Sequence, residues 1–576
     1  MTAPYYPTDQ QKTVIIHDRS AFVTACPGAG KTRTMVERAR HLADRTDDKR
    51  GVAFLSFTNA AVDELQGRLR LFGLLPSPLF PSFIGTFDRF LWQFFIAPFG
   101  IPGCAAIPRL VPDKDNWEVK PPFPRAQALT LECFDRRTGV INAARAGKQG
   151  FDTTNRNPAA WETCARRIIQ SAQNKGLVDF DDVRLCVAER LTDTDFAARV
   201  GAALAARFRE IVVDEAQDCN PSDLAVVDWL RLSGLAVKVI CDPHQSIFQF
   251  RGGITNELLR FADTFDPSDR LVMSGNFRST AAICAAIVAL RPPSARADKD
   301  EAVGKHKDDP TPIHLLSYSG SGVSTAIGAK FTDLVRSLDI PFRHAPVLAS
   351  RLPSAAKAIG QPTLGKTNEK SLLLAQAVMS YHFAFAAGNR REALTALHRM
   401  ILFIQGHIGA MGDYHNHLAE SGMIDGCWRP DVIAVANVLR YEPGETPEQW
   451  LARARISVGA GMATGQNVNQ RLRSHADLAT ALATAPVDAP PPRTIHSAKG
   501  LEFPAVCVVM TSQKAGRILD YLEGGTSNGS DEDARKIYVA ASRAERLLVM
   551  AIPKSTAGRM EALFTSVGCA VQVHKI

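Results

Sequence analysis

One stretch of the sequence has the residue types and spacing of a loop that binds phosphate. It reads Ala-Cys-Pro-Gly-Ala-Gly-Lys-Thr from Ala25 to Thr32 and follows an apolar run. Glycines let backbone N–H groups wrap phosphate oxygens, and the helix that follows directs the positive end of its dipole at them. In this pattern the lysine reaches the β and γ phosphates and the hydroxyl residue binds Mg²⁺. The expected nucleotide-binding residues are therefore Ala25, Cys26, Pro27, Gly28, Ala29, Gly30, Lys31 and Thr32.

Two adjacent carboxylates end another apolar run. Asp214 and Glu215 come directly after Ile211–Val213 and are followed by Gln217 and Asp218. The carboxyl ends of strands are where α/β sheets place their ligands. Asp214 can therefore hold Mg²⁺, and Glu215 can orient and deprotonate the attacking water. Together with the loop, these acids predict hydrolysis of a nucleoside triphosphate.

Such residues need strands that end, and helices that begin, at one edge of a sheet. The expected strands of a first block are Ala21–Ala25, Val52–Phe57, Ser82–Thr86, Ile211–Val213 and Val237–Ile240, and helices are expected at Thr32–Leu42, Asn59–Leu71 and Pro221–Leu232. The expected strands of a second block are Ile313–Tyr318, Val347–Ser350, Val506–Met510 and Leu547–Ala551. Buried strands that alternate with amphipathic helices predict parallel sheets covered on both faces.

Two stretches interrupt this alternation. Residues 95–178 are punctuated by prolines and then helical, and residues 355–485 are alanine-rich with helical periodicity. Ala485–Arg493 predicts a rigid linker because its prolines cannot continue a helix. We therefore predict an α/β fold of two parallel-sheet cores, each with a mostly helical insertion. The expected segments are 1–94, 95–178 and 179–265 for the first core and its insertion, and 266–354, 355–485 and 486–576 for the second.

Composition restricts the number of domains, the partners and the location of the protein less strongly than the motifs restrict its chemistry. The chain has 576 residues, too many for one core, and a net charge of +8, which suits a nucleic-acid partner. Its 11 cysteines form no CxxC pair, which argues against a zinc ribbon or an iron–sulfur cluster and favours reduced thiols. The sequence has neither a signal core nor an apolar run long enough for a bilayer, so we expect a cytoplasmic protein without a membrane partner.

Further motifs occur in the order and spacing of a known helicase family. They are Thr8–Gln11, Phe54–Asn59, Ile84–Phe87, Asp179–Asp182, Asp214–Gln217, Cys241–Gly252, Asn276–Ser279, Thr494–Glu502 and Tyr538–Ala544. In these motifs the chain resembles the UvrD/Rep/PcrA group of superfamily 1 (SF1A) DNA helicases. The resemblance implies RecA-like cores, ATP with Mg²⁺ as cofactors, and DNA as the partner.

The resemblance also implies roles around the nucleotide. Gln11 would recognise the adenine, with Gln10 as the alternative register, and Phe277 would stack on the base with Arg33 nearby. Glu502 would contact the ribose.

Three further residues would act at the γ-phosphate. Gln245 would sense it, and Arg278 and Arg543 of the second core would clamp it as arginine fingers. One such charge is worth roughly 10³–10⁵ in turnover. The expected catalytic set is thus Lys31, Asp214, Glu215, Gln245, Arg278 and Arg543.

Six residues occupy positions that touch the DNA strand in this family. Aromatic faces stack on any base, which gives grip without sequence preference. The expected DNA-binding residues are Phe57, Thr58, Asn59, Thr86, Phe250 and His496.

The sequence is compatible with two functions. The first is a helicase that translocates 3′→5′ on single-stranded or tailed DNA, in DNA repair or in antiviral defence. The second is a DNA-sensing ATPase that regulates a partner nuclease without processive unwinding. Small insertions and the short segment Glu523–Gly529 make the chain similar to the helicase-like subunit of the Gabija anti-phage system. About 26 residues follow Met550, so we expect no fused nuclease domain.

Overall fold

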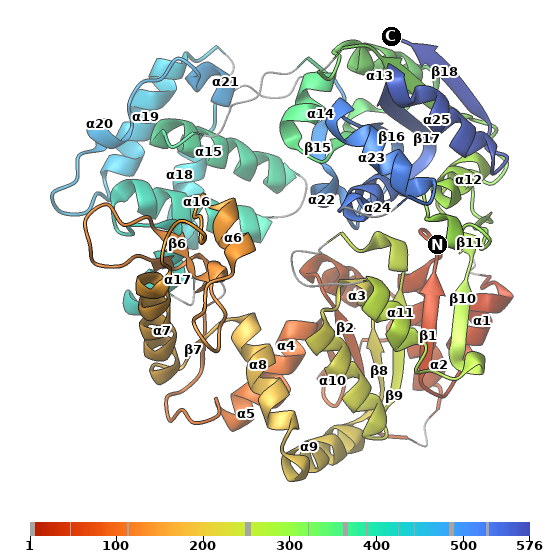
Figure 1. The fold of residues 1–576 in the computed structure, drawn as a ribbon, viewed down its shortest axis with the longest axis horizontal. Helices are drawn as coiled ribbons and strands as arrows, with labels where there is room; N and C mark the ends of the chain where they lie inside the picture. The colour runs from red at the N-terminus through yellow and green to blue at the C-terminus, as the bar shows by residue number, and fades with distance from the viewer. Residues whose placement is uncertain are drawn as a thin grey trace. The chain divides into compact units, whose positions relative to one another are not determined.

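The chain divides into two compact units in a computed structural model (Figure 1). Unit 1 comprises Met1–Phe90, Ala188–Pro362 and Ala485–Ile576, and unit 2 comprises Leu91–Val187 and Thr363–Thr484. The structure describes residues 6–45, 48–75, 77–111, 114–247, 255–320, 322–360, 367–386, 390–423, 426–442, 444–482, 489–525 and 529–576.

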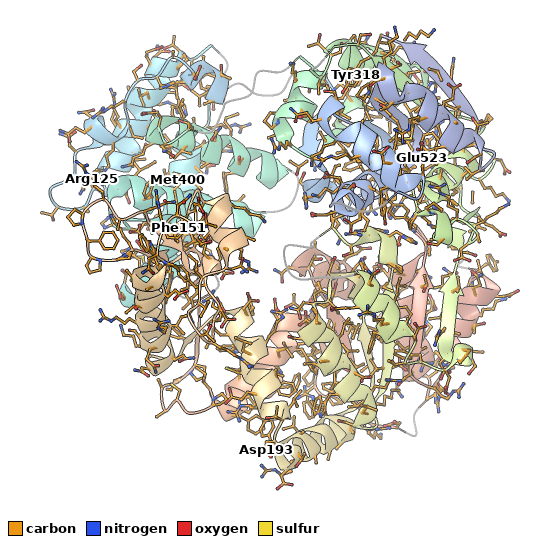
Figure 2. All side chains as sticks on the ribbon, in the orientation of Figure 1. Arg125, Phe151, Asp193, Tyr318, Met400 and Glu523 are labelled. Carbon is orange, nitrogen blue, oxygen red and sulfur yellow. The ribbon has the colours of Figure 1, made fainter. Side chains whose placement is uncertain are left out.

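The first sheet of unit 1 has six strands in the order β10-β1-β9-β8-β2-β3, and all of its pairs are parallel. The strands are β1 (Ala21–Ala25), β2 (Gly51–Ser56), β3 (Phe83–Thr86), β8 (Phe208–Val213), β9 (Ala236–Cys241) and β10 (Arg270–Met273). The accompanying helices are α1 (Asp9–Ile16), α2 (Lys31–Ala43), α3 (Asn59–Leu71), α4 (Phe87–Leu91), α9 (Thr194–Arg207), α10 (Pro221–Leu232) and α11 (Thr255–Ala262). Asp193, labelled in Figure 2, caps the N-terminus of α9. All six residues of β2 are buried, as expected for a strand covered on both faces.

The second sheet of unit 1 is also parallel and has the order β15-β14-β16-β17-β13-β18. Its strands are β13 (Ile313–Tyr318), β14 (Val347–Ala349), β15 (Pro492–Thr494), β16 (Phe503–Val509), β17 (Ala544–Pro553) and β18 (Val571–Lys575). The helices are α12 (Ala281–Ala289), α13 (Ala326–Ser337), α14 (Leu352–Ala358), α22 (Ile495–Ala498), α23 (Ser512–Leu522), α24 (Ser530–Ala541) and α25 (Lys554–Thr565). A short parallel pair, β11 (Gly275–Asn276) and β12 (Glu301–Ala302), stands apart from the sheet.

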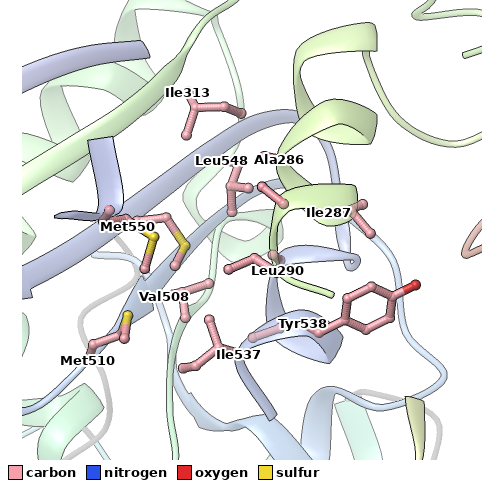
Figure 3. Close-up of a cluster of buried hydrophobic side chains, with 14 of the residues drawn as sticks. Ala286, Ile287, Leu290, Ile313, Val508, Met510, Ile537, Tyr538, Leu548 and Met550 are labelled. Atoms are coloured by element: carbon pink, nitrogen blue, oxygen red, sulfur yellow. The ribbon is translucent and has the colours of Figure 1, made fainter. Parts of the chain in front are cut away.

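Aliphatic side chains from strands and helices form the core of this second sheet. Ile287 and Leu290 come from α12 and the residue after it, Val508 from β16, and Leu548 and Met550 from β17 (Figure 3). All five are at most 3% exposed. Two parallel sheets with buried strands and covering helices confirm the predicted α/β class.

In the two six-stranded sheets, three strands were not predicted from the sequence: β10, β15 and β18. All lie at sheet edges and are partly exposed, so they lack a continuous apolar run. Pro492 begins β15 inside the segment predicted as a linker. Proline is tolerated there because an edge strand has one side without ladder hydrogen bonds. Residues 485–488 of the same segment lie outside the described residues.

Unit 2 consists mainly of helices. They are α5 (Ala97–Phe99), α6 (Ala143–Lys148), α7 (Ala159–Asn174), α15 (Lys370–Ala386), α16 (Arg390–Gln405), α17 (Tyr414–Glu420), α18 (Arg429–Val438), α19 (Pro447–Gly459), α20 (Val468–Arg471) and α21 (Leu478–Leu482); α8 (Phe180–Leu191) begins in this unit. Two short strand pairs, β4 (Arg109–Leu110) with β7 (Leu177–Val178) and β5 (Glu118–Val119) with β6 (Leu129–Thr130), complete it. Trp450 is fully buried and donates its indole N–H to the Leu439 carbonyl at 2.7 Å.

The motif at Asp179–Asp182 forms the start of α8. The Asp179 carboxylate accepts from the Asp182 backbone N–H at 2.9 Å and pairs with Arg136 at 2.7 Å. Asp182 pairs with the buried ammonium of Lys114 at 2.5 Å. The motif therefore caps a helix and pairs with two cations, the buried Lys114 and the partly buried Arg136.

A buried histidine predicts acid sensitivity of unit 2. His398 is 5% exposed, its ring stacks on Trp428 at 4.0 Å, and its Nδ1 lies 2.9 Å from the Tyr414 hydroxyl. Burial, with a contribution from His417, lowers the pKa of His398 from 6.5 to about 4. Between pH 6.5 and 4 the His398 imidazole is protonated in the unfolded chain but neutral in the folded one. The contribution of the neutral, buried imidazole to the free energy of unfolding is therefore complete above pH 6.5 and is lost as the pH falls towards 4.

We expect the thermal unfolding midpoint to fall between pH 7 and 5, and to fall less in His398→Gln, whose side chain does not titrate. Scanning calorimetry of both proteins across this range makes the comparison. Equal losses in the two proteins would show that His398 does not contribute.

Among the described residues, none of the helices combines the length and the apolar character needed to cross a bilayer.

Candidate nucleotide site and nucleic-acid surface

The loop between β1 and α2 has a backbone that only glycine adopts easily. Gly28 and Gly30 have φ values of +72° and +73°. A Cβ at Gly28 would also lie 2.5 Å from Asn276 Oδ1 and 2.7 Å from Arg278 Cβ. The Phe277 N–H donates to the Gly28 carbonyl at 2.9 Å. The loop therefore packs closely against the segment of the Asn276–Ser279 motif.

Gln11 contacts this loop directly. It is 1% exposed, and its Nε2 donates to the Ala29 carbonyl at 2.9 Å. Its Oε1 accepts from the Thr8 N–H at 3.0 Å within the capping box of α1. Gln10 is exposed and instead bonds to Ser274. Gln11 rather than Gln10 therefore places its side-chain amide at the loop.

Lys31 and the two acids after β8 form one group, in which Asp214 is buried and the other two are partly buried. The Lys31 ammonium lies 3.7 Å from Glu215 Oε1. Burial alone would lower the pKa of Lys31, but Glu215 and Asp214 raise it above its usual value. Burial also raises the pKa of Asp214, with the neighbouring Glu215 charge acting in the same direction. For Glu215, Lys31 and Lys499 outweigh burial and hold the pKa below its usual value, so Glu215 is an ionised acceptor.

The residues expected to hold Mg²⁺ fit a hard cation. Asp214 Oδ1 is buried and has no hydrogen-bond partner among the described residues. A carboxylate oxygen with no donor is a suitable ligand for Mg²⁺, which also keeps waters and phosphate oxygens around it. Thr32 stands in the first turn of α2. Asp214 and the Thr32 hydroxyl would hold the ion, which neutralises charge on the phosphates when bound.

Gln245 is held from two directions. It ends the turn Pro243–Gln245 that follows β9, and it is 4% exposed. Its Nε2 donates to Asp242 Oδ2 at 2.8 Å, and its Oε1 accepts from Arg543 Nη2 at 2.6 Å. Arg543 follows α24 in the second sheet and is 3% exposed. The structure therefore joins two expected catalytic residues that are 298 positions apart.

Arg278 reaches the same region. Its Nη1 donates to the Ser542 carbonyl at 2.7 Å, and its Nη2 pairs with the Glu502 carboxylate. Burial would raise the pKa of Glu502, but Arg278 holds it below its usual value. Arg278 Nε is buried without a hydrogen-bond partner among the described residues. An unused guanidinium donor beside the glycine loop is suited to an anionic oxygen.

The expected base-binding residues are only partly brought together. The ring of Phe277 comes within 3.8 Å of the position that a Cβ of Gly30 would take. Arg33 pairs with Glu37 at 3.0 Å, and its guanidinium lies 4.4 Å from the centroid of the Phe72 ring. Phe72 was not predicted as a partner of Arg33, since it stands one residue beyond α3.

Sequence reasoning also gave no role to a buried ion pair between the sheets. The Lys499 ammonium lies 2.7 and 2.6 Å from the two carboxylate oxygens of Asp218. Asp218 follows the acids of β8, and Lys499 belongs to the Thr494–Glu502 motif. The sequence signals were the place of Asp218 directly after the Asp214–Gln217 motif and that of Lys499 within another motif, and 281 positions separate the two residues.

Four of the expected DNA-binding residues lie at or just after the ends of neighbouring strands of the first sheet. Phe57 and Asn59 follow β2, and Thr86 ends β3, which pairs with β2 in parallel. Phe57 stacks on the buried Phe87 ring, with centroids 5.4 Å apart and 15° between the planes. Thr58 caps α3, Thr86 accepts from the Arg89 N–H at 3.2 Å, and Asn59 is exposed.

The other two expected DNA-binding residues are His496 and Phe250. His496 lies in α22 of the second sheet, is half-buried, and burial lowers its pKa. Phe250 lies outside the described residues.

Comparison with known proteins agrees with this architecture. The model of the UvrD/REP helicase N-terminal domain matches residues 7–96 and 115–266. The model of the UvrD-like helicase C-terminal domain matches residues 491–555. These ranges contain the glycine loop and the acids in the first model, and Glu502 and Arg543 in the second.

Several curated relatives are similar over part or nearly all of the chain. The chain is 24% identical to the putative ATP-dependent DNA helicase YjcD of Bacillus subtilis, over 47% of this chain and 36% of the relative. It is 25% identical to DNA helicase II of Salmonella typhimurium, over 49% of this chain and 40% of that protein. It is 23% identical to the ATP-dependent DNA helicase UvrD2 of Mycobacterium tuberculosis, over 96% of this chain and 79% of the relative.

The match thus spans about two fifths of the first two relatives. The two domain models follow each other in the expected order and together cover more than half of the residues. The chain therefore belongs to the UvrD/Rep family of superfamily 1 helicases.

Proposed function

We propose that this protein is a DNA-dependent ATPase that moves 3′→5′ along single-stranded or tailed DNA and separates strands. The hydrogen bond of 2.6 Å between Gln245 and Arg543 supports this most directly. It links the turn after β9, where a γ-phosphate sensor is expected, to the second sheet. Loss of phosphate at that turn would therefore act on both cores, as a motor requires.

Polar groups around the glycine loop would bind and hydrolyse the nucleotide. Lys31 would bind the phosphates, Asp214 and Thr32 the Mg²⁺, and Glu215 would take the proton of the attacking water. Arg278 and Arg543 would stabilise the charge that develops on the phosphoryl group. Gln11 would read the base from beside the loop, with Phe277, Arg33 and Glu502 completing the nucleoside contacts.

The DNA side rests on Phe57. One face of its ring is stacked on Phe87, and the ring is only half-buried. A base can therefore stack on the other face, which is worth roughly 1–3 kcal/mol. Thr58, Asn59 and Thr86 surround the same strand ends, while His496 and Phe250 would extend the path of the DNA.

We propose the cytoplasm as the location of the protein, since both DNA and ATP are found there.

The same motor could serve a partner nuclease. In that alternative the protein senses DNA and regulates the nuclease in an anti-phage complex of the Gabija type, without processive unwinding. The limited size of the two segments of unit 2, Leu91–Val187 and Thr363–Thr484, supports this alternative. Copurification of a nuclease, together with ATPase activity but no strand displacement, would select it over the helicase.

We expect ATP hydrolysis to be slow alone and to rise on adding single-stranded DNA of mixed sequence. DNA bound to both cores favours the closed arrangement in which the arginines reach the phosphate. Activation should weaken as salt increases, because cationic contacts release counterions. Phe57→Ala should raise the DNA concentration needed for half-maximal activation by about tenfold, from the loss of one stacked base.

The measurements are ATPase titrations with DNA at several salt concentrations, and unwinding of duplexes with 3′ or 5′ tails. Ile16→Ala, at an exposed site at the end of α1, is a control for truncation of an apolar side chain. Hydrolysis that is independent of DNA and salt would contradict the motor, and preference for a 5′ tail would contradict the polarity.

A further inference from the structure

A buried tyrosine from a helix of the second sheet forms a hydrogen bond with a residue that follows a strand of the first sheet. Tyr538 lies in α24 and is 1% exposed. Figure 3 shows its ring leaving the aliphatic cluster, with the hydroxyl oxygen directed away from Ile537 and Val508. That hydroxyl donates to Asp242 Oδ2 at 3.2 Å, and Asp242 follows β9 of the first sheet.

The direction of this hydrogen bond is set by the groups around it. Burial raises the pKa of Tyr538 well above its usual value, and Asp242 adds to the effect, so the phenol keeps its proton. The phenol oxygen also lies 3.4 Å from Arg291 Nη2. Arg291 is in turn fixed by Asp300 at 2.5 Å and by the Asp298 carbonyl at 2.8 Å. The tyrosine therefore faces a cation with its oxygen and a carboxylate with its proton.

The acceptor of the Tyr538 proton is the atom that also holds Gln245. Asp242 Oδ2 accepts from Gln245 Nε2 at 2.8 Å as well as from the tyrosine. At the other end of the amide, Arg543 donates to Gln245 Oε1 at 2.6 Å. One N–H and one lone pair of the amide remain for water and phosphate. The orientation of the amide is thus defined at both ends.

The two residues that fix the Gln245 amide, Tyr538 and Arg543, come from one short segment beside the second sheet. Tyr538 lies in α24 and Arg543 two residues beyond its end. A third contact, from Arg535 Nε to the Ser246 carbonyl at 2.7 Å, joins α24 to the residue after Gln245. Removal of the tyrosine hydroxyl alone would therefore leave the helix attached.

We propose that Tyr538 is a positioning residue for ATP hydrolysis, which orients the Gln245 amide through Asp242. The inference rests on the proposed ATPase function and adds a second line of contact to the direct one from Arg543. The tyrosine is buried and would act through Asp242 rather than by contact with the nucleotide. It restricts the carboxylate of Asp242, and that carboxylate decides where the remaining N–H of Gln245 points.

The test compares two buried tyrosines of the same sheet. Tyr538→Phe removes the hydroxyl that reaches Asp242. Tyr318→Phe removes one that donates to the Met510 carbonyl at 2.6 Å, within the second sheet (Figure 2). Both residues are 1% exposed, so the two changes should lower the melting temperature similarly. Only Tyr538→Phe should reduce kcat, by about tenfold, while KM for ATP changes less than twofold.

A double-mutant cycle separates positioning from a structural effect. In a Gln245→Ala background, Tyr538→Phe should produce no further loss of kcat, because the amide it orients is gone. If the full tenfold loss persists in that background, or if Tyr318→Phe reduces kcat equally, the proposal is overturned.

A binding measurement distinguishes failure of this inference from failure of the proposed function. Affinities for ADP with aluminium fluoride, which imitates the phosphoryl group in transfer, are compared with those for ADP alone. Tyr538→Phe should weaken binding of the fluoride complex about tenfold and leave ADP binding unchanged. If the variant shows this pattern and the wild-type protein does not hydrolyse ATP, the proposed function is refuted and the positioning role is supported. No difference between the two ligands in the variant would refute the positioning role.

Discussion

Replacement of Glu215 by glutamine is expected to leave ATP bound but to slow its hydrolysis by roughly 10²–10⁴. Lys31 and Lys499 keep this carboxylate ionised despite its burial, which is the state a general base needs. Its backbone adopts a left-handed conformation with φ of +56°, and Gln217 donates to its side chain. Glutamine has the same shape and can accept that hydrogen bond, but it cannot take a proton from water.

The measurements are kcat at saturating single-stranded DNA and affinity for a fluorescent ATP analogue. Lys31→Ala is the contrasting variant, since it should weaken binding itself by removing the cation at the phosphates. Glu448→Gln, at an exposed site in α19, controls for the same chemical change away from the nucleotide. Near wild-type turnover in Glu215→Gln would show that another group is the base.

Arg543→Ala is expected to lower turnover by roughly 10³–10⁵, the worth of an arginine that stabilises a transferring phosphoryl group. Burial lowers the pKa of Arg543 to about 10, so it remains charged at neutral pH. Its guanidinium bonds to Gln245 at 2.6 Å and to the Ser542 hydroxyl at 2.9 Å. Arg543→Lys should recover only part of the loss, because an ammonium lacks the planar set of donors.

A nearby arginine provides the control for charge and packing. Arg546 stands three residues further along, in β17, and pairs with Asp309 at 3.0 Å. Arg546→Ala should leave kcat within about twofold, since surface ion pairs contribute little. Melting temperatures of both variants distinguish lost chemistry from lost folding. A well-folded Arg543→Ala protein with normal turnover would remove this residue from the catalytic set.

Local sequence determined much of the first sheet and its helices. Ala21–Ala25 was predicted as a strand with the bounds that the structure has, because a short apolar run before a glycine loop is buried on both faces. Asn59–Leu71 and Pro221–Leu232 also agree in both bounds. The reason is capping: Thr58 accepts from the Ala61 N–H, and Asn220 forms a capping box before a proline.

The same reasoning identified the chemistry of the nucleotide loop and the acids, because glycines, a lysine and paired carboxylates are required at fixed short spacings. Strand ends were less well defined. The run Leu547–Ala551 is part of the longer β17 (Ala544–Pro553), whose first residues are less apolar. Edge strands such as β18 escaped prediction for a similar reason, since half-exposed residues leave no clear pattern.

Only the tertiary structure decided which side chains are partners across long sequence separations. Examples are the choice of Gln11 over Gln10 at the loop, the ion pair of Lys499 with Asp218, and the hydrogen bond of Tyr538 to Asp242. A sequence states which groups are able to bond, but distance and burial determine which of them do. Neighbours along the chain set helices and strands, whereas the side chains that meet between two sheets depend on how all of those elements pack.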